Sequence, residues 1–99
     1  MNQSGPGTSS ADDLSAARSE IERLDRALVR LIGARLRAAS VVAAAKRAEG
    51  IPLFDPGQEA RVVRRAGEWA REDALPEEDV RHLFWRLVAI TRHAQAERT

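Results

Sequence analysis

Apolar residues recur every seven positions along the first half of the chain. One line of them consists of Leu14, Ile21, Leu28 and Val42, and a second consists of Ala17, Leu24, Leu31, Ala38 and Ala45. This spacing places both lines on one face of an α-helix that packs against other helices. No proline interrupts residues 13–48, and good helix formers dominate them. The pattern therefore predicts one long helix over residues 13–48.

Breaks in the pattern predict two shorter helices. Glycine and proline at residues 50–52 end the first helix. Asp55 then stands at an N-cap position, with Pro56 at the first helical position, and this second helix is predicted to end near Arg71. A further proline precedes a third helix over residues 77–96, whose first turn is acidic.

The length of the first helix favours an oligomer. A helix of about 36 residues is about 54 Å long, whereas a compact domain of about 100 residues has a radius of gyration near 13 Å. Two shorter helices are too short to cover its apolar face. We therefore expect an all-α subunit of three helices in a two-fold homodimer. The helical domain is expected over residues 13–97, after a disordered Ser/Gly/Pro-rich tail over residues 1–12.

Composition narrows the classes of partner. The 99 residues carry a formal net charge of +1, so a nucleic-acid or anionic-membrane partner is not expected. No run of about eighteen apolar residues could span a membrane. The tail lacks the basic start and apolar core of a signal peptide, and we expect a cytoplasmic protein. Cysteine is absent, which excludes a disulfide framework.

Arg35 occupies a position on the first apolar line, between Leu28 and Val42. A guanidinium keeps its charge, and burying it without a partner costs several kcal/mol. Lys46 follows eleven residues later, about three turns along the helix, and returns to nearly the same face. The two cations predict a site for a negatively charged small molecule. The alternative is that Arg35 forms a structural ion pair and Lys46 is solvated.

Polar groups on the other two helices extend this site. The inner stripe predicted for the third helix consists of Val80, Leu83, Phe84, Leu87 and Ile90. Thr91 and Gln95 continue the stripe at helical spacing, so we expect both to face inward and to need partners. Asp55 and Glu59 lie four residues apart on the second helix and can project toward the same cavity. Asp55 has a second explanation, because Gln58 three residues later completes a capping box.

These positions, taken together, resemble the all-helical class of chorismate mutases. The resemblance covers residues 14–96 and rests on Arg18, Ile21, Leu24, Asp25, Leu28, Leu31, Ile32, Arg35, Val42, Lys46, Pro52, Asp55, Glu59, Leu83, Phe84, Thr91 and Gln95. It implies an intertwined homodimer with two active sites, each completed by the other subunit. It also implies a cytoplasmic isomerase of aromatic amino acid biosynthesis, in the shikimate pathway, without metal or cofactor.

The reaction implied by the resemblance is the rearrangement of chorismate, a dicarboxylate, to prephenate. Its ether oxygen gains negative charge as the bond to the ring breaks. The reaction needs a substrate held in its reactive conformer and cations directed at the developing charge. The resemblance implies that Lys46 and Gln95 hydrogen-bond the ether oxygen.

The remaining roles implied by the resemblance concern substrate binding. Arg18 from the partner subunit and Arg35 would bind the carboxylates. Thr91 stands where many relatives carry a serine that assists a carboxylate. Asp55 and Glu59 would hold the ring hydroxyl.

One position departs from the family pattern. Gln58 stands where many relatives carry an arginine, immediately before Glu59. A neutral residue there better tolerates an ammonium on ring carbon four, which favours 4-amino-4-deoxychorismate mutases of antibiotic biosynthesis as an alternative. A second alternative is an isochorismate-pyruvate lyase, and a third is that Arg61, one turn later, replaces the missing cation.

A non-enzymatic alternative also remains at this stage. A helical dimerisation module would use a buried arginine to specify pairing. The two classes differ in the effect of replacing Arg35, which would abolish activity in an enzyme and dimerisation in such a module. Some members of the mutase class act with an activating partner enzyme, so such a partner is a further alternative for this chain.

Overall fold

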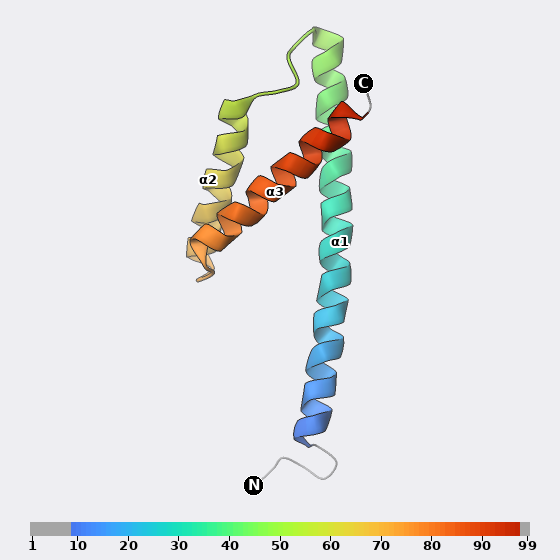
Figure 1. Cartoon of the computed structure of the whole chain (residues 1–99), viewed down its shortest axis with the longest axis vertical. Helices are drawn as coiled ribbons and strands as arrows, with labels where there is room; N and C mark the ends of the chain where they lie inside the picture. Colours follow the sequence, from blue (N-terminus) through green and yellow to red (C-terminus); the bar gives the residue numbers. More distant parts are fainter. Residues whose placement is uncertain (1–8, 98–99) are drawn as a thin grey trace. The chain divides into compact units, whose positions relative to one another are not determined.

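The computed structural model describes residues 9–97, and all regular structure among them is helical. Its helices are α1 (Ser10–Glu49), α2 (Pro56–Glu72) and α3 (Glu77–Ala96) (Figure 1). No strand occurs in this described part of the chain. The expected all-α subunit of one long and two shorter helices is therefore confirmed. None of the described helices offers an apolar stretch long enough to cross a membrane.

The start of α1 differs from the prediction. The helix begins at Ser10, so the last three residues of the expected tail belong to the helix. The Ser9 hydroxyl oxygen accepts a hydrogen bond from the Asp12 backbone nitrogen at 3.1 Å, which is an N-cap interaction. Asp12 and Asp13 place negative charge in the first turn, where the helix dipole favours it. The expected tail over residues 1–8 lies outside the described residues.

The end of α1 is set by a glycine. Gly50 has a φ of 71°, a left-handed conformation that glycine adopts without steric cost. The Ile51 backbone nitrogen donates to the Lys46 carbonyl at 2.9 Å, and that of Gly50 to the Arg47 carbonyl at 3.2 Å. These bonds resemble a Schellman-type helix end. The loop that leads to α2 therefore begins after Glu49, close to Lys46.

The chain divides into two compact units, one ending at Ala34 and one beginning at Arg35. The described part of the first unit is the N-terminal portion of α1, whose apolar line is uncovered in the single chain. Ile21 is 57% exposed and Leu28 is 56% exposed. The second unit contains the remainder of α1 with α2 and α3. A single domain over residues 13–97 stays a prediction.

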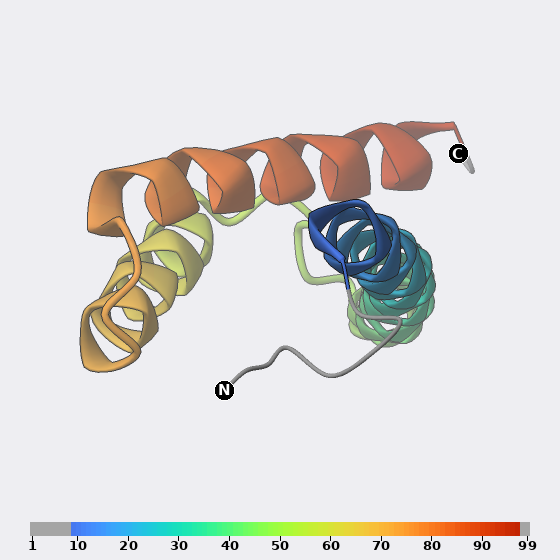
Figure 2. The same ribbon diagram turned by 90° about the horizontal axis from the view of Figure 1, so that it is seen from below.

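The core of the second unit is made by small and β-branched side chains. Its buried apolar residues are Ala43 on α1, Val63, Ala66 and Ala70 on α2, and Val88 on α3. The N-terminal half of α3 packs on α2, and its C-terminal half reaches the part of α1 after Arg35 (Figure 2). Because α3 contacts two different helices, each half of it buries a different set of side chains.

The inner stripe predicted for α3 is therefore only partly correct. Val80, Phe84 and Leu87 are half-buried, but Leu83 is 58% exposed and Ile90 is 40% exposed. Val88 is buried in their place. The face of α3 that contacts the rest of the second unit is thus rotated away from the Leu83 and Ile90 side.

The junction between α2 and α3 is an ion-pair cluster. The Glu77 carboxylate accepts hydrogen bonds from the guanidinium groups of Arg71 and Arg81, and Arg81 also pairs with Glu78. The bond from Arg71 lowers the pKa of Glu77, although partial burial opposes the shift. The Arg81 side chain crosses Gly67 so closely that a Cβ there would lie 2.7 Å from Arg81 Nε. A side chain at position 67 would displace Arg81.

Candidate functional site

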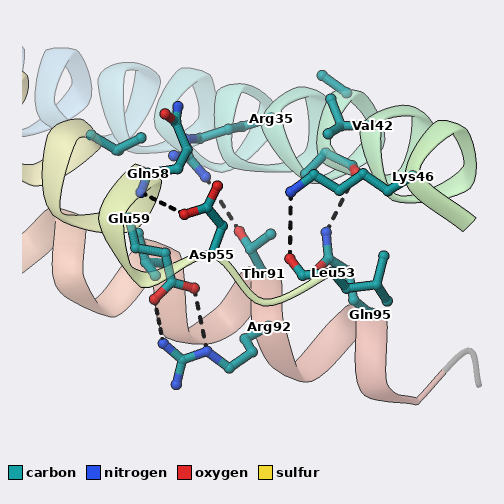
Figure 3. Close-up of a pocket in the computed structure, with 14 residues that line it drawn as sticks. Arg35, Val42, Lys46, Leu53, Asp55, Gln58, Glu59, Thr91, Arg92 and Gln95 are labelled. Carbon is teal, nitrogen blue, oxygen red and sulfur yellow. Dashed lines mark hydrogen bonds and ion pairs between the residues drawn. The ribbon is translucent and has the colours of Figure 1, made fainter. Parts of the chain in front are cut away.

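A pocket of about 340 Å³ lies within the second unit. Its polar lining residues are Arg35, Lys46, Asp55, Gln58, Glu59, Thr91, Arg92 and Gln95 (Figure 3). Apolar side chains, including Val42, Val62 and Val88, form the rest of its wall. The volume falls within the range of about 300–1,000 Å³ that small-molecule sites occupy. Seven of the eight residues proposed from the sequence are therefore together in one pocket.

Arg35 is half-buried and faces α3. Its Nη1 donates to the Thr91 hydroxyl oxygen at 3.3 Å, and the hydroxyl itself donates to the Leu87 carbonyl at 2.8 Å. Among the described residues, Arg35 forms no ion pair with an acid. The described part of the chain therefore does not show the alternative, a structural ion pair of Arg35 within the subunit. The charge of Arg35 is available to an anion in the pocket.

Among the described residues, the hydrogen bonds of Lys46 and Gln95 are long ones to backbone carbonyls. Lys46 Nζ donates to the Leu53 oxygen at 3.5 Å, and Gln95 Nε2 donates to the Ala39 oxygen at 3.4 Å. Bonds of this length lie beyond the usual range of about 2.7–3.2 Å and are weak. Both donors can exchange these bonds for stronger ones to a ligand without a large loss of stability.

Asp55 and Gln58 form the start of α2. The Asp55 carboxylate accepts from the Gln58 backbone nitrogen at 3.1 Å, so its predicted role as N-cap is confirmed. The Gln58 side chain does not close the predicted capping box, because its Oε1 accepts from Arg61 Nε at 3.0 Å. Arg61 itself is absent from the described lining of the pocket. Arg61 thus holds the amide of Gln58 and does not replace the missing cation directly.

Arg92 is a lining residue that the sequence reasoning missed. Its guanidinium donates from Nη2 to Glu59 Oε1 at 2.6 Å and from Nε to Glu59 Oε2 at 3.4 Å. It also lies over the ring of Phe54, 4.8 Å from the ring centroid. Arg92 is four residues after Val88 and three before Gln95, so helical spacing was the signal that could have found it.

Arg18 is the one proposed residue that does not line this pocket. It belongs to the first unit and is exposed in the single chain. Its expected contribution requires a second copy of the chain, so it stays a prediction.

The chemistry that this lining supports is electrostatic. Of the described residues that line the pocket, three are cationic and two are carboxylates. The Thr91 hydroxyl donates its proton to the Leu87 carbonyl and accepts a hydrogen bond from the Arg35 guanidinium. Neither of these partners is a base that could remove the hydroxyl proton. An activated nucleophile would need a base within hydrogen-bond reach. The pocket is therefore suited to binding an anionic molecule and to stabilising negative charge that develops on it.

Comparison with known proteins assigns a family to this arrangement. The family model described as chorismate mutase type II matches residues 17–96, which include every lining residue of the pocket. Neither a search of curated proteins nor a search of solved structures gave a match.

Proposed function

The chain belongs to the chorismate mutase type II family, and we therefore propose that it converts chorismate to prephenate in the pocket lined by Arg35 and Lys46. The observation that supports this most is the pair of half-buried cations that lack an acidic partner among the described residues. A dicarboxylate supplies the negative charge that they need. The rearrangement is intramolecular and requires no covalent catalyst.

The proposed mechanism combines positioning with charge stabilisation. Arg35 binds a substrate carboxylate beside the Thr91 hydroxyl and holds the molecule in its compact conformer. Lys46 and Gln95 leave their long bonds to backbone carbonyls and donate to the ether oxygen. As the carbon–oxygen bond to the ring breaks, negative charge grows on this oxygen and both bonds strengthen. Asp55 and Glu59, at the start of α2, accept a hydrogen bond from the ring hydroxyl.

The proposal includes an intertwined homodimer. Large apolar side chains of the first unit are exposed in the single chain, among them Leu14, Ile21, Leu24, Leu28 and Leu31. Each contributes about 1.5–3 kcal/mol when it is buried. A second copy of the same helix can cover them through a two-fold axis. Arg18 of the partner subunit would then complete the pocket as a further carboxylate ligand.

The Arg35→Ala variant tests this function. Loss of the guanidinium should lower kcat/KM for chorismate by about a hundredfold or more, which is typical for removal of one preorganised charge-stabilising donor. Arg37→Ala, an exposed arginine outside the pocket, is the matched control and should retain activity. Unchanged chorismate turnover by a folded Arg35→Ala dimer would contradict the proposal. Loss of the dimer in Arg35→Ala would instead favour a dimerisation module.

A second candidate substrate is 4-amino-4-deoxychorismate, and the observation that favours it is the neutral Gln58 in the pocket. Incubation with chorismate, 4-amino-4-deoxychorismate and isochorismate separates the candidates, because a lyase releases free pyruvate and a mutase does not. Gln58→Arg should raise kcat/KM for chorismate relative to the 4-amino compound. A fall in that ratio would argue against a role of Gln58 in selecting the substrate.

A further inference from the structure

The ion pair between Arg92 and Glu59 is the feature of the pocket that this mechanism leaves unexplained. Both carboxylate oxygens of Glu59 accept from the Arg92 guanidinium. The Glu59 side chain is only 19% exposed, whereas that of Arg92 is 51% exposed. In Figure 3 Glu59 points toward Arg92, and both residues are drawn among those that line the pocket.

The position of Arg92 is fixed from two sides. Glu59 holds its guanidinium from α2, and Phe54 in the preceding loop provides a ring face beneath it. A planar guanidinium is suited to both contacts, since it binds carboxylates through two donors and stacks on aromatic rings. Other ion pairs of the described chain, such as Arg71 with Glu77, do not include lining residues of the pocket. The Arg92 charge is therefore held at the site itself.

Pairing with Arg92 changes what Glu59 can select. An ionised carboxylate with one guanidinium still has lone pairs that accept a hydrogen bond from a neutral hydroxyl. A substrate ammonium at the same place finds the Glu59 charge already neutralised and meets the positive charge of Arg92. Like charges at close range repel, and partial burial reduces the screening by solvent. The pair therefore favours a neutral donor over a cationic one.

Arg92 also affects the overall charge balance. With Gln58 neutral, Arg92 is the third cation of the described lining, against the two carboxylates Asp55 and Glu59. The lining is thus net positive, which suits a substrate with two carboxylates and no compensating ammonium. Arg92 therefore disfavours a ring ammonium, whereas the neutral Gln58 alone would tolerate one.

We propose that Arg92 is a specificity-determining residue, which acts through its ion pair with Glu59 to select a ring hydroxyl over a ring ammonium. This inference rests on the proposed function, because that function places the ring substituent against Glu59. It identifies the preferred substrate class as a dicarboxylate with a neutral hydroxyl at that position.

The test compares kcat/KM for chorismate and for 4-amino-4-deoxychorismate in the wild type and in Arg92→Gln. Removal of the charge should lower the ratio of chorismate to the 4-amino compound by about fivefold, the factor that corresponds to the upper range of about 1 kcal/mol for a partly exposed ion pair. Arg86→Gln is the matched control, since Arg86 is an exposed arginine of α3 outside the pocket, and it should leave the ratio unchanged.

The outcomes separate this inference from the proposed function. A merely structural role of Arg92 would lower kcat/KM for both compounds by the same factor, and an unchanged or increased ratio in Arg92→Gln would overturn the inference while the enzyme remains active. If the wild type rearranges neither compound, the proposed function fails. In that case calorimetry measures the dissociation constants of chorismate and of the 4-amino compound for the wild type and for Arg92→Gln. A preference for chorismate that falls in Arg92→Gln supports the inference, and an unchanged or increased preference overturns it. Binding of neither compound would overturn both.

Discussion

Individual cations of the pocket differ in what holds them. Arg92 is paired with an acid, whereas the hydrogen-bond partners of Arg35 and Lys46 in the described part of the chain are a hydroxyl and a backbone carbonyl, respectively. Because Arg35 and Lys46 are only half-buried, each charge keeps part of its solvation and forms no ion pair that stabilises the fold, but it interacts strongly with an anionic ligand in a partly enclosed site. Arg35 and Lys46 are therefore expected to influence activity much more than stability.

Lys46→Ala is the clearest example at this scale. We expect kcat for chorismate to fall by about a hundredfold or more, because the ether oxygen loses its cationic donor. The free energy of unfolding should change by less than about 1 kcal/mol, since the hydrogen bond that this substitution removes is the long 3.5 Å contact from Lys46 Nζ to the Leu53 carbonyl. Steady-state kinetics and urea denaturation measure the two quantities. Arg47→Ala, an exposed neighbour, serves as control, and equal kcat values for the two variants would refute the assignment.

Helix boundaries and individual side-chain partners were predictable to different degrees. Gly50 marked the end of α1 and Pro56 marked the start of α2, and the cap at Asp55 followed from the same local chemistry. The partner of the Gln58 side-chain amide was not predictable, because the amide can either close the capping box at Asp55 or accept from Arg61, one turn later. Arg92 was missed because an arginine beside an inward threonine resembles a solvated residue until its partner on another helix is known.

Gly67→Ala tests the packing of α3 on α2. The added Cβ would lie 2.7 Å from Arg81 Nε, so Arg81 must move and its ion pairs weaken. Gly57→Ala is the matched control, because its nearest neighbouring atom would lie 3.6 Å away in ordinary contact. Chemical denaturation should show Gly67→Ala to be less stable than Gly57→Ala by up to about 1 kcal/mol, because the displaced atoms belong to the flexible Arg81 side chain and the loss is that of partly exposed ion pairs. Equal stabilities would indicate that Arg81 adjusts freely.

The α2–α3 junction should respond to acid through Glu77. Its pKa is lowered mainly by the hydrogen bond from Arg71, so the folded state binds the proton less well than the unfolded chain. The stabilisation is fully present above the ordinary glutamate pKa of about 4.3 and is lost as pH falls through the lowered value. The stability difference between wild type and Glu77→Gln should therefore shrink in acid, as followed by urea denaturation. A stability difference that stays the same at low pH would contradict this role of Glu77.

At the level of the whole molecule, the pocket belongs to the second compact unit, whereas the exposed apolar residues from Leu14 to Leu31 belong to the first. The heptad pattern predicted the apolar line well, because the periodicity of a helix depends on local sequence. What covers that line is not specified by any local pattern, and the second chain that we propose for this role lies outside what a single helix can predict. The exposed leucines are the observation behind the proposed dimer, in which function and assembly would be coupled.

Leu24→Glu tests this coupling. Leu24 lies on the apolar line and is 47% exposed in the single chain. A charge at this position should be excluded from a helix interface, so we expect a monomer and loss of activity. Arg26→Glu is the control, because two residues rotate the side chain by about 200° to the opposite face. Sedimentation velocity measures the assembly, and a fully active monomer would show that the pocket needs no second subunit.

The most direct test of the shared active site is to mix two inactive variants. In a dimer of Arg18→Ala with Arg35→Ala, one of the two sites regains both arginines. After unfolding and refolding together, random pairing should restore about a quarter of wild-type chorismate mutase activity, because about half the dimers are mixed and each has one intact site. Refolding each variant alone is the control and should restore none. A mixture that stays as inactive as its components would contradict the account of a pocket completed across the dimer.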